Sequence, residues 1–185
     1  MESKNPKIFL ISGKARNGKD TVADLIIKNY QNSGLKILKL AYGSYIKMYA
    51  KNISNWDGNE ETKPRELLQQ LGTDLIRNKI DELLFVNRIC EDIKVYSYFF
   101  DALIISDVRM KNEMEIPEAL FDNVVKIKVV RPNFETPLTE TEQNHKTECD
   151  LDNYNDYDYI INNDSDLNEL EKKVNDILKE VKNEH

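Results

Sequence analysis

Residues 13–21 place two glycines and a lysine at a spacing that few folds can use. The segment reads Gly-Lys-Ala-Arg-Asn-Gly-Lys-Asp-Thr and directly follows the apolar run at residues 8–11. Gly13 and Gly18 allow backbone conformations that other residues resist, so successive N–H groups can converge on phosphate oxygens. Lys19 reaches toward the β- and γ-phosphates, and the positive end of the following helix also favours an anion. The spacing therefore predicts a buried strand, a phosphate-binding loop and a helix, in that order.

Asp20 stands where this pattern usually has serine or threonine, whose hydroxyl group is a magnesium ligand. A carboxylate is also a hard oxygen ligand, so Asp20 is a candidate to hold Mg²⁺ directly or through water, and Thr21 is a candidate to supply the hydroxyl. The alternative is that Asp20 only stabilises the positive helix N-terminus. The candidate nucleotide-binding residues are Gly13, Lys14, Ala15, Arg16, Asn17, Gly18, Lys19, Asp20 and Thr21.

Composition limits the class of protein. The chain has 185 residues, 40% apolar and 32% charged, which is enough for one domain with a sizeable core. A net charge of -7 argues against a general nucleic-acid binder. No apolar run is long enough to span a bilayer, and the first residues lack the apolar core of a signal peptide. Two cysteines, Cys90 and Cys149, provide no disulfide framework, which fits a reduced cytoplasmic setting. Taken with the charge and the lack of a membrane span, we expect a cytoplasmic protein with no nucleic-acid or membrane partner.

Apolar runs alternate with helical patterns along the chain. The predicted strands lie at residues 7–12, 35–41, 102–106, 123–130 and 159–161. The predicted helices lie at residues 19–32, 44–53, 64–79, 83–98, 112–120 and 167–182, and the polar, aperiodic segment lies at 133–157. This alternation predicts an α/β fold in which a parallel sheet of about five strands carries helices on both faces. Ligands bind beyond the carboxyl ends of the strands in this class.

Charged residues follow two further predicted strands. Asp107 and Arg109 come directly after the third strand, and Arg131 follows the fourth. Because the carboxyl ends of parallel strands share one edge, we expect these side chains near the phosphate-binding loop. There an acid holds Mg²⁺ or its water shell, and an arginine neutralises charge on a transferred phosphoryl group. The alternative is that Asp107 caps a helix at residues 111–120 and pairs with Arg109.

Polar side chains also lie along the helix predicted at residues 64–79. Arg65 and Gln69 are four residues apart and share a helix face, and Arg77 lies two turns further, beyond Gly72. A guanidinium group suits a phosphate, and an amide suits a base edge. The periodicity alone is more typical of an ordinary surface helix, with Gly72 as a candidate break.

Three stretches carry a resemblance to a known family. They are residues 12–24, residues 65–73, and residues 105–109 together with Asn112 and Glu113. On these stretches the chain resembles the deoxynucleoside monophosphate kinases of phages and their bacterial relatives. The Lys-Asp-Thr ending of the loop is much more selective than a general phosphate-binding loop. Residues 145–154 and 157–163 also match, and there and at the loop the animal-type phosphomevalonate kinases are similar too.

The resemblance implies a single P-loop kinase domain over residues 1–185, with a nucleoside-monophosphate-kinase-like sheet, an acceptor-binding helical segment at about 42–98 and a lid-like segment at about 132–157. Lids of many such kinases carry several arginines. The only basic residues between 132 and 152 are His145 and Lys146. The resemblance therefore does not say whether such an arginine-poor lid supports fast turnover.

The implied reaction is ATP-dependent phosphorylation of a nucleoside or deoxynucleoside monophosphate with Mg²⁺. The implied catalytic residues are Lys19, Arg16, Asp107, Arg109 and Arg131, and the implied metal ligands are Asp20, Thr21 and Asp107. The implied acceptor-binding residues are Lys47, Arg65, Gln69 and Arg77, although Lys47 also fits a solvated helix lysine. The alternatives are a phosphomevalonate kinase and a nucleotide-binding switch without efficient kinase activity. We expect a monomer or a homodimer.

Overall fold

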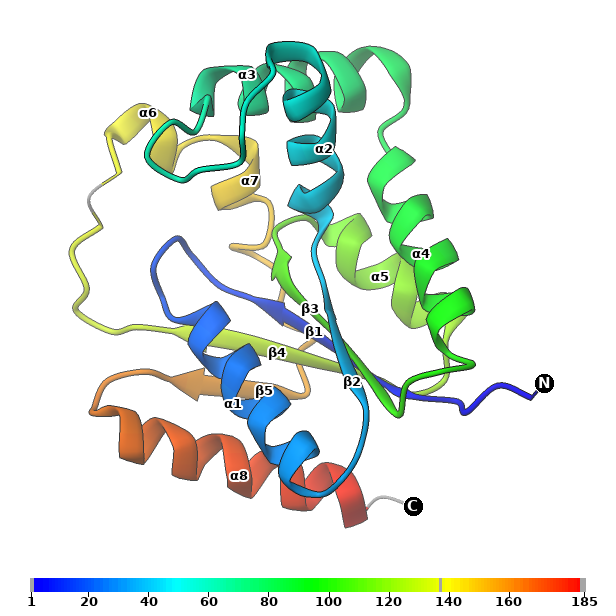
Figure 1. Cartoon of the computed structure of the whole chain (residues 1–185). Coiled ribbons are helices and arrows are strands. Elements are labelled where there is room, and N and C mark those ends of the chain that lie inside the picture. Colours follow the sequence, from blue (N-terminus) through cyan, green and yellow to red (C-terminus); the bar gives the residue numbers. More distant parts are fainter. Residues whose placement is uncertain (1, 137, 184–185) are drawn as a thin grey trace.

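The structure is a computed structural model that describes residues 2–136 and 138–183, and one parallel sheet forms its centre (Figure 1). The strands are β1 (Lys7–Ser12), β2 (Ile37–Leu40), β3 (Ala102–Val108), β4 (Val124–Val130) and β5 (Tyr159–Asn162). They lie in the order β2-β3-β1-β4-β5, and each neighbouring pair is parallel. Parallel neighbours need a long crossover connection, which the intervening helices supply. The predicted α/β class and five-stranded parallel sheet are confirmed.

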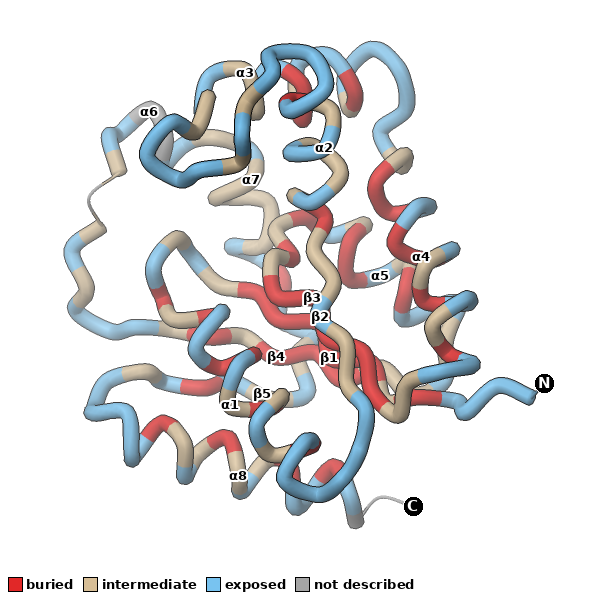
Figure 2. Tube along the Cα trace, in the orientation of Figure 1, coloured by how far each residue is buried: buried red, intermediate tan, exposed pale blue. Residues whose placement is uncertain are grey.

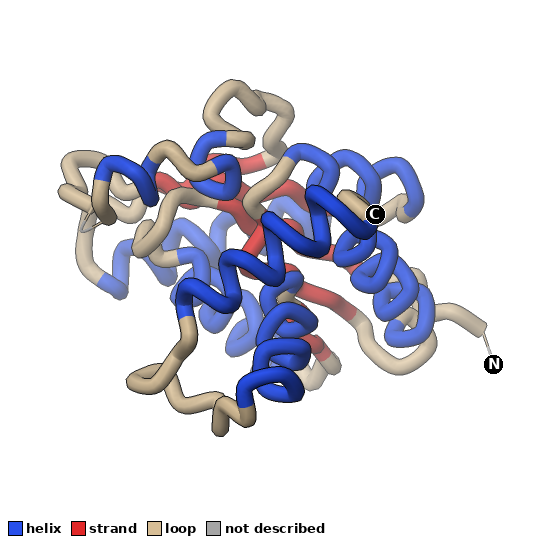
Figure 3. Tube along the Cα trace, turned by 90° about the horizontal axis from the view of Figure 1, so that it is seen from above, coloured by secondary structure: helices blue, strands red, loops and turns tan. Residues whose placement is uncertain are grey.

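Helices cover both faces of the sheet, and from above the strands lie between them (Figure 3). One face carries α1 (Lys19–Asn32) and α8 (Leu167–Asn183), and the other carries α4 (Leu84–Tyr96) and α5 (Lys111–Leu120). In β1, Phe9 and Ile11 pack toward the first pair, while Ile8 and Leu10 pack toward the second. Because both faces are covered, the four central residues of β1, at positions 8–11, are all apolar and buried (Figure 2). No helix in the described part of the chain is both long and apolar enough to cross a bilayer.

Several helices gather beyond the carboxyl edge of the sheet (Figure 1). They are α2 (Tyr42–Ser54), α3 (Arg65–Gln69), η1 (Gln70–Ile80), α6 (Glu140–Gln143) and α7 (Lys146–Cys149). The helix predicted at 64–79 is present, but it changes from α3 to the wider turns of a π-helix in η1. Gly72 does not break it. A Cβ atom there would lie 2.8 Å from the Ile46 side chain, so glycine allows η1 to approach α2 closely.

Strand β3 is longer than the sequence predicts. The prediction that Asp107 follows the end of this strand is wrong, because β3 continues to Val108. Val108 pairs with Ser12 after a local shift in register between β1 and β3. Asp107 therefore lies within the strand, and its position is fixed by the sheet.

Candidate active site

The loop between β1 and α1 has the conformation that its glycines permit. Gly13, Arg16 and Gly18 have φ angles of 150°, 61° and 98°. A Cβ atom on Gly13 would collide with the main-chain oxygen of Val129, and one on Gly18 would collide with the Asn163 amide. Both glycines are therefore required for two reasons, the backbone angle and the lack of room.

Residues from the far half of the chain hold this loop in place. The Asn17 side chain is buried and donates a hydrogen bond of 3.2 Å to the main-chain oxygen of Val129, at the end of β4. The Asn163 side chain, just after β5, donates one of 3.0 Å to the main-chain oxygen of Asn17. The loop is therefore shaped by its neighbours in the sheet as well as by its own sequence.

Lys19 lies inside the loop and is only 8% exposed. Its ammonium group donates hydrogen bonds of 2.8 Å and 2.9 Å to the main-chain oxygens of Gly13 and Lys14. Burial, together with the nearby Arg109 charge, lowers the pKa of Lys19 to about 8. An anion in the loop would favour the protonated amine, so this lysine is suited to bind phosphate.

Asp20 lies at the start of α1 beside oxygen and nitrogen donors from β2 and β3. Its carboxylate is 2.9 Å from the Lys39 ammonium group, and the Ser106 hydroxyl donates a hydrogen bond of 3.2 Å to it. Burial opposes ionisation of Asp20, but the hydrogen bond and charge of Lys39 outweigh it and lower the pKa of this carboxyl. Thr21 is exposed on the next position of the helix.

Asp107 connects β3 to the start of α2. Its two carboxylate oxygens accept hydrogen bonds from the backbone N–H groups of Tyr42 and Gly43, each 2.9 Å long. Burial raises the pKa of Asp107 against the effect of these hydrogen bonds. Asp107 thus stabilises the positive end of α2. At the start of α5 a different acid has this position: Glu113 accepts hydrogen bonds from the backbone N–H groups of Arg109 and Met110.

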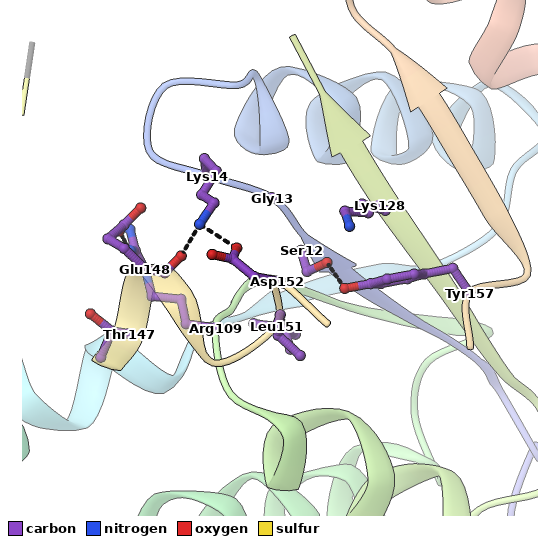
Figure 4. Close-up of a pocket in the computed structure, with 11 residues that line it drawn as sticks. Ser12, Gly13, Lys14, Arg109, Lys128, Thr147, Glu148, Leu151, Asp152 and Tyr157 are labelled. Atoms are coloured by element: carbon purple, nitrogen blue, oxygen red, sulfur yellow. Dashed lines mark hydrogen bonds and ion pairs between the residues drawn. The ribbon is translucent and has the colours of Figure 1, made fainter. Parts of the chain in front are cut away.

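Arg109 and the loop converge on a carboxylate from α7 (Figure 4). Arg109 forms an ion pair with Glu148, and the backbone N–H of Ala15 donates a hydrogen bond of 3.1 Å to the same carboxylate. Lys14 donates to the main-chain oxygen of Glu148 and forms an ion pair with Asp152. The Glu148 side chain is only 9% exposed. Loop and arginine therefore form a site for a negatively charged group, and Glu148 lies in it.

A second hollow opens beside the loop at the end of β4. Its lining includes Asn17, Val130, Arg131, Phe134 and Leu138. The Arg131 guanidinium lies over the Phe134 ring at 4.5 Å. Both apolar and polar side chains line this hollow, which adjoins the loop residues Lys14 and Ala15. Arg16 is exposed on the loop itself.

The predicted acceptor residues are separated in the structure. The Arg65 side chain is 76% exposed and lies 3.8 Å from Glu60, and Gln69 is exposed one turn further. Arg77 is 9% exposed and pairs at 2.8 Å with Glu113. It also lies over the Phe85 ring at 4.9 Å.

Glu113, the partner of Arg77, is itself buried, and burial raises the pKa of this carboxyl to about 7 despite the Arg77 charge. Arg65 and Arg77 therefore have different surroundings, one exposed and one buried. Lys47 lies on α2 in a groove that is also lined by Glu60, the neighbour of Arg65.

Comparison with known proteins identifies the family. Residues 38–174 match the family described as deoxynucleotide monophosphate kinase. The chain belongs to this family. It is 35% identical over 116 residues to the deoxynucleotide monophosphate kinase of Enterobacteria phage T4 and 33% identical over 155 residues to that of Escherichia phage RB69. These matches cover 62% and 80% of this chain but 45% and 59% of the two phage proteins. A putative deoxynucleotide monophosphate kinase of Acanthamoeba polyphaga mimivirus is 25% identical, with 90% of this chain and 93% of that protein covered.

Solved structures support the fold of this family member. The APS kinase of Mycobacterium tuberculosis in complex with AMPPNP and APS is 13% identical, with a TM-score of 0.54 over 94% of this chain and 98% of that one. Dephospho-CoA kinase from Campylobacter jejuni is also 13% identical, with a TM-score of 0.50 over 96% of this chain and 98% of that one. The likeness extends through the sheet and its helices, and it concerns the fold alone.

Sequence reasoning missed several residues of this family member's site. Glu148 and Asn163 lie in stretches that carried the resemblance, but no role was predicted for either. Glu148 contacts a residue 133 positions away in the sequence, and Asn163 contacts one 146 positions away, so no local sequence pattern predicts these contacts. Ser106 was also missed, although it directly precedes Asp107 and has a hydroxyl group.

Proposed function

We propose that this protein transfers the γ-phosphoryl group of ATP to a deoxynucleoside monophosphate. The observation that carries the proposal is the site around Glu148, where the backbone N–H of Ala15 and the Arg109 guanidinium hold a carboxylate and Lys14 lies alongside, bonded to the main-chain oxygen of Glu148. Convergent donors of this kind stabilise a phosphoryl group during transfer. Membership of the deoxynucleotide monophosphate kinase family supports the acceptor class.

The proposed reaction needs no covalent bond between the protein and the transferred phosphoryl group. An oxygen of the acceptor phosphate forms a bond to the γ-phosphorus while the bond from that phosphorus to the β–γ bridging oxygen breaks, which yields ADP and a nucleoside diphosphate. The acceptor phosphate is already ionised, so no general base is needed. Catalysis then consists of alignment and charge stabilisation.

The donor side is assigned to the loop and the hollow next to it. Lys19 and the backbone N–H groups of residues 13–21 bind the phosphates, and Arg16 and Arg109 neutralise developing charge. The hollow at the end of β4 receives the remainder of ATP, with Arg131 at its rim. Lys19 exchanges its two carbonyl partners for phosphate oxygens when ATP binds.

The oxygen donors at the start of α1 fit a magnesium ion. Asp20, Ser106 and Asp107 supply two carboxylates and a hydroxyl group, and Thr21 supplies a further hydroxyl. Mg²⁺ prefers one or two carboxylates together with phosphate and water oxygens, so this set is sufficient. The ion would neutralise charge on the β- and γ-phosphates. Asp107 meanwhile keeps α2 attached to the sheet through its two backbone hydrogen bonds.

Residues 132–157 act as the lid of one kinase domain that spans residues 1–185. Glu148 must leave the Ala15 N–H and Arg109 before a phosphate can take its place, because one donor set cannot serve both anions. The lid contributes few cations, so Lys14 and Arg109, from the loop and from just beyond β3, supply the positive charge. The acceptor binds against residues 42–98, with Lys47, Arg65, Gln69 and Arg77 as the proposed contacts.

A coupled assay of ADP release tests this proposal. Each common nucleoside and deoxynucleoside monophosphate is supplied with ATP and Mg²⁺, and phosphomevalonate is included as the alternative acceptor. We expect turnover with at least one deoxynucleoside monophosphate. Turnover with phosphomevalonate alone would favour that kinase instead. ATP binding with no phosphorylated product would favour a nucleotide-binding switch.

A further inference from the structure

A groove on α2 has the dimensions and chemistry of a nucleotide site. Its volume is about 450 Å³, within the usual range for small-molecule sites. The lining includes Ser44, Lys47, Met48, Lys51, Trp56 and Gly58. The α2 residues among them recur at intervals of three and four, so they lie on one face of the helix. The loop between α2 and α3 runs beside α2 (Figure 1), and its residues Trp56, Gly58 and Glu60 complete the lining.

The groove begins next to the proposed catalytic centre. Ser44 directly follows Gly43, whose backbone N–H is bonded to Asp107. From Ser44 the groove follows α2 as far as Lys51, a distance of roughly 10 Å at 1.5 Å per residue. A nucleoside monophosphate with its phosphate at Ser44 would therefore extend its base away from the catalytic centre.

Trp56 is held in a defined position at the far end of this groove. Its indole N–H donates a hydrogen bond of 3.0 Å to the main-chain oxygen of Asn59, and the Lys51 ammonium group lies 5.7 Å from its ring centroid. Gly58 has a φ angle of 93°, and a Cβ atom there would collide with the Lys51 side chain. Glycine at this position therefore leaves room for the Lys51 side chain beside the indole. The indole remains half-buried.

Positive charge and apolar surface lie side by side in the groove. Among the described residues Lys47 and Lys51 form no ion pair, but Glu60, which also lines the groove, lies near Lys47, and Asp57 lies near Lys51. Glu60 is itself paired with Lys63 at 2.7 Å. Met48 is 42% exposed. In a chain of net charge -7, two such lysines beside an exposed methionine and an indole match a ligand with a phosphate and a flat ring.

We propose that this groove binds the acceptor nucleotide, with the phosphate at Ser44 and Lys47 and the base stacked on Trp56. The proposal rests on the proposed function and makes it more specific. Every base has a π-face, so stacking on an indole binds deoxynucleotides without selecting strongly among them. Selection among bases then falls to hydrogen-bonding side chains elsewhere.

Trp56 is the single tryptophan of the chain, so its fluorescence tests the proposal without any measurement of activity. Wild-type protein is titrated with a deoxynucleoside monophosphate and, separately, with 2-deoxyribose 5-phosphate, which has the same sugar and phosphate but no base. We expect saturable quenching by the nucleotide and little change with the sugar phosphate. Nucleotide binding detected by calorimetry with no change in fluorescence would overturn the proposal.

Kinetics supply the second test. Trp56→Ala should raise KM for the deoxynucleoside monophosphate at least tenfold and leave KM for ATP unchanged, whereas Trp56→Phe should retain most of the affinity. Tyr98→Ala, which removes an exposed aromatic ring at the other end of the sheet, is the matched control.

The two proposals fail in different ways. If wild type phosphorylates a deoxynucleotide and Trp56→Ala does so with the same KM, the groove is not the acceptor site and the function stands. If wild type phosphorylates no nucleotide, the function fails. In that case, quenching by the nucleotide would still establish the groove as a nucleotide site. An absence of quenching would overturn the groove proposal together with the proposed function.

Discussion

The loop between β1 and α1 and the helices α2, α3 and η1 lie beyond the same edge of the sheet, but they are stabilised differently. The loop is fixed by backbone angles, by buried Asn17 and by contacts to β4 and Asn163. Helices α2, α3 and η1 contact the rest of the fold where Asp107 holds the start of α2 and through the buried Tyr42 and Ile76, but many of their other side chains are exposed. Under the proposed function, the fixed loop serves one donor, and the more exposed helices adapt to the acceptor. The following experiments test this difference.

Removal of the loop lysine should have the largest effect. Lys19→Ala should reduce kcat by about 10²–10³-fold or more, since it deletes a charged donor from a water-excluded site. The fold should remain intact, which circular dichroism and urea unfolding would verify. Lys28→Ala, on the exposed face of the same helix, is the control and should retain full activity. Normal turnover in a folded Lys19→Ala protein would contradict the donor-site assignment.

Replacement of Arg77 and of Arg65 by alanine should have different effects on the free energy of unfolding. Arg77→Ala leaves the buried Glu113 without its partner and should lower the free energy of unfolding by about 3 kcal/mol. Arg65→Ala, on the surface, should change it by less than about 0.5 kcal/mol. Urea unfolding of both variants measures the difference. An Arg77→Ala protein with wild-type stability would contradict a structural role for the Arg77–Glu113 pair, and a raised KM for the acceptor without loss of stability would leave the proposed acceptor contact as its only role.

Asp20 should control the magnesium requirement. Asp20→Ala should raise the Mg²⁺ concentration for half-maximal activity by about tenfold, because one hard oxygen ligand is lost, and Asp20→Ser should recover part of it. Asp24→Ala removes the other carboxylate that pairs with Lys39 and is the control. If both Asp20 variants keep the wild-type Mg²⁺ dependence, the acid serves only the helix N-terminus.

Glu148 should compete with ATP for the loop. Glu148→Gln removes the charge that pairs with Arg109 and should lower the dissociation constant for ATP roughly fivefold, or about 1 kcal/mol. Glu140→Gln, an exposed acid in the same lid-like segment, should leave it unchanged. Equilibrium binding of a fluorescent ATP analogue measures both. Weaker binding in Glu148→Gln would mean that Glu148 positions Arg109 for ATP and does not compete with it.

The smallest effect concerns pH. The pKa of Lys19 is about 8 in the protein without phosphate, and a bound anion raises it. Below pH 8 the amine already carries its proton, whereas above pH 8 binding must take one up, so ATP affinity falls as pH rises. The dissociation constant should increase about threefold between pH 7.5 and 8.5. A constant value across this range would show that another group dominates the loop.

The sequence by itself determined the sheet, the loop and the helix after it. An apolar strand, two glycines at fixed spacing and a lysine specify local geometry, because backbone angles and strand burial depend on neighbouring residues. The same reasoning placed Asp107 and Arg109 at the functional edge. It predicted the helix at residues 64–79 but not its π-helical turns from Gln70 to Ile80.

Only the tertiary structure decided which charges meet. Arg77 pairs with Glu113, 36 residues away, and Glu148 reaches the Ala15 N–H across 133 residues. Trp56 and Lys51 come together beyond the end of α2, where Asn55 has a φ angle of 55°. Long side chains have several rotamers, and their choice depends on burial and on partners that the fold brings near. The sequence therefore indicates the kind of chemistry at this edge of the sheet, and the fold selects the residues that are free to perform it.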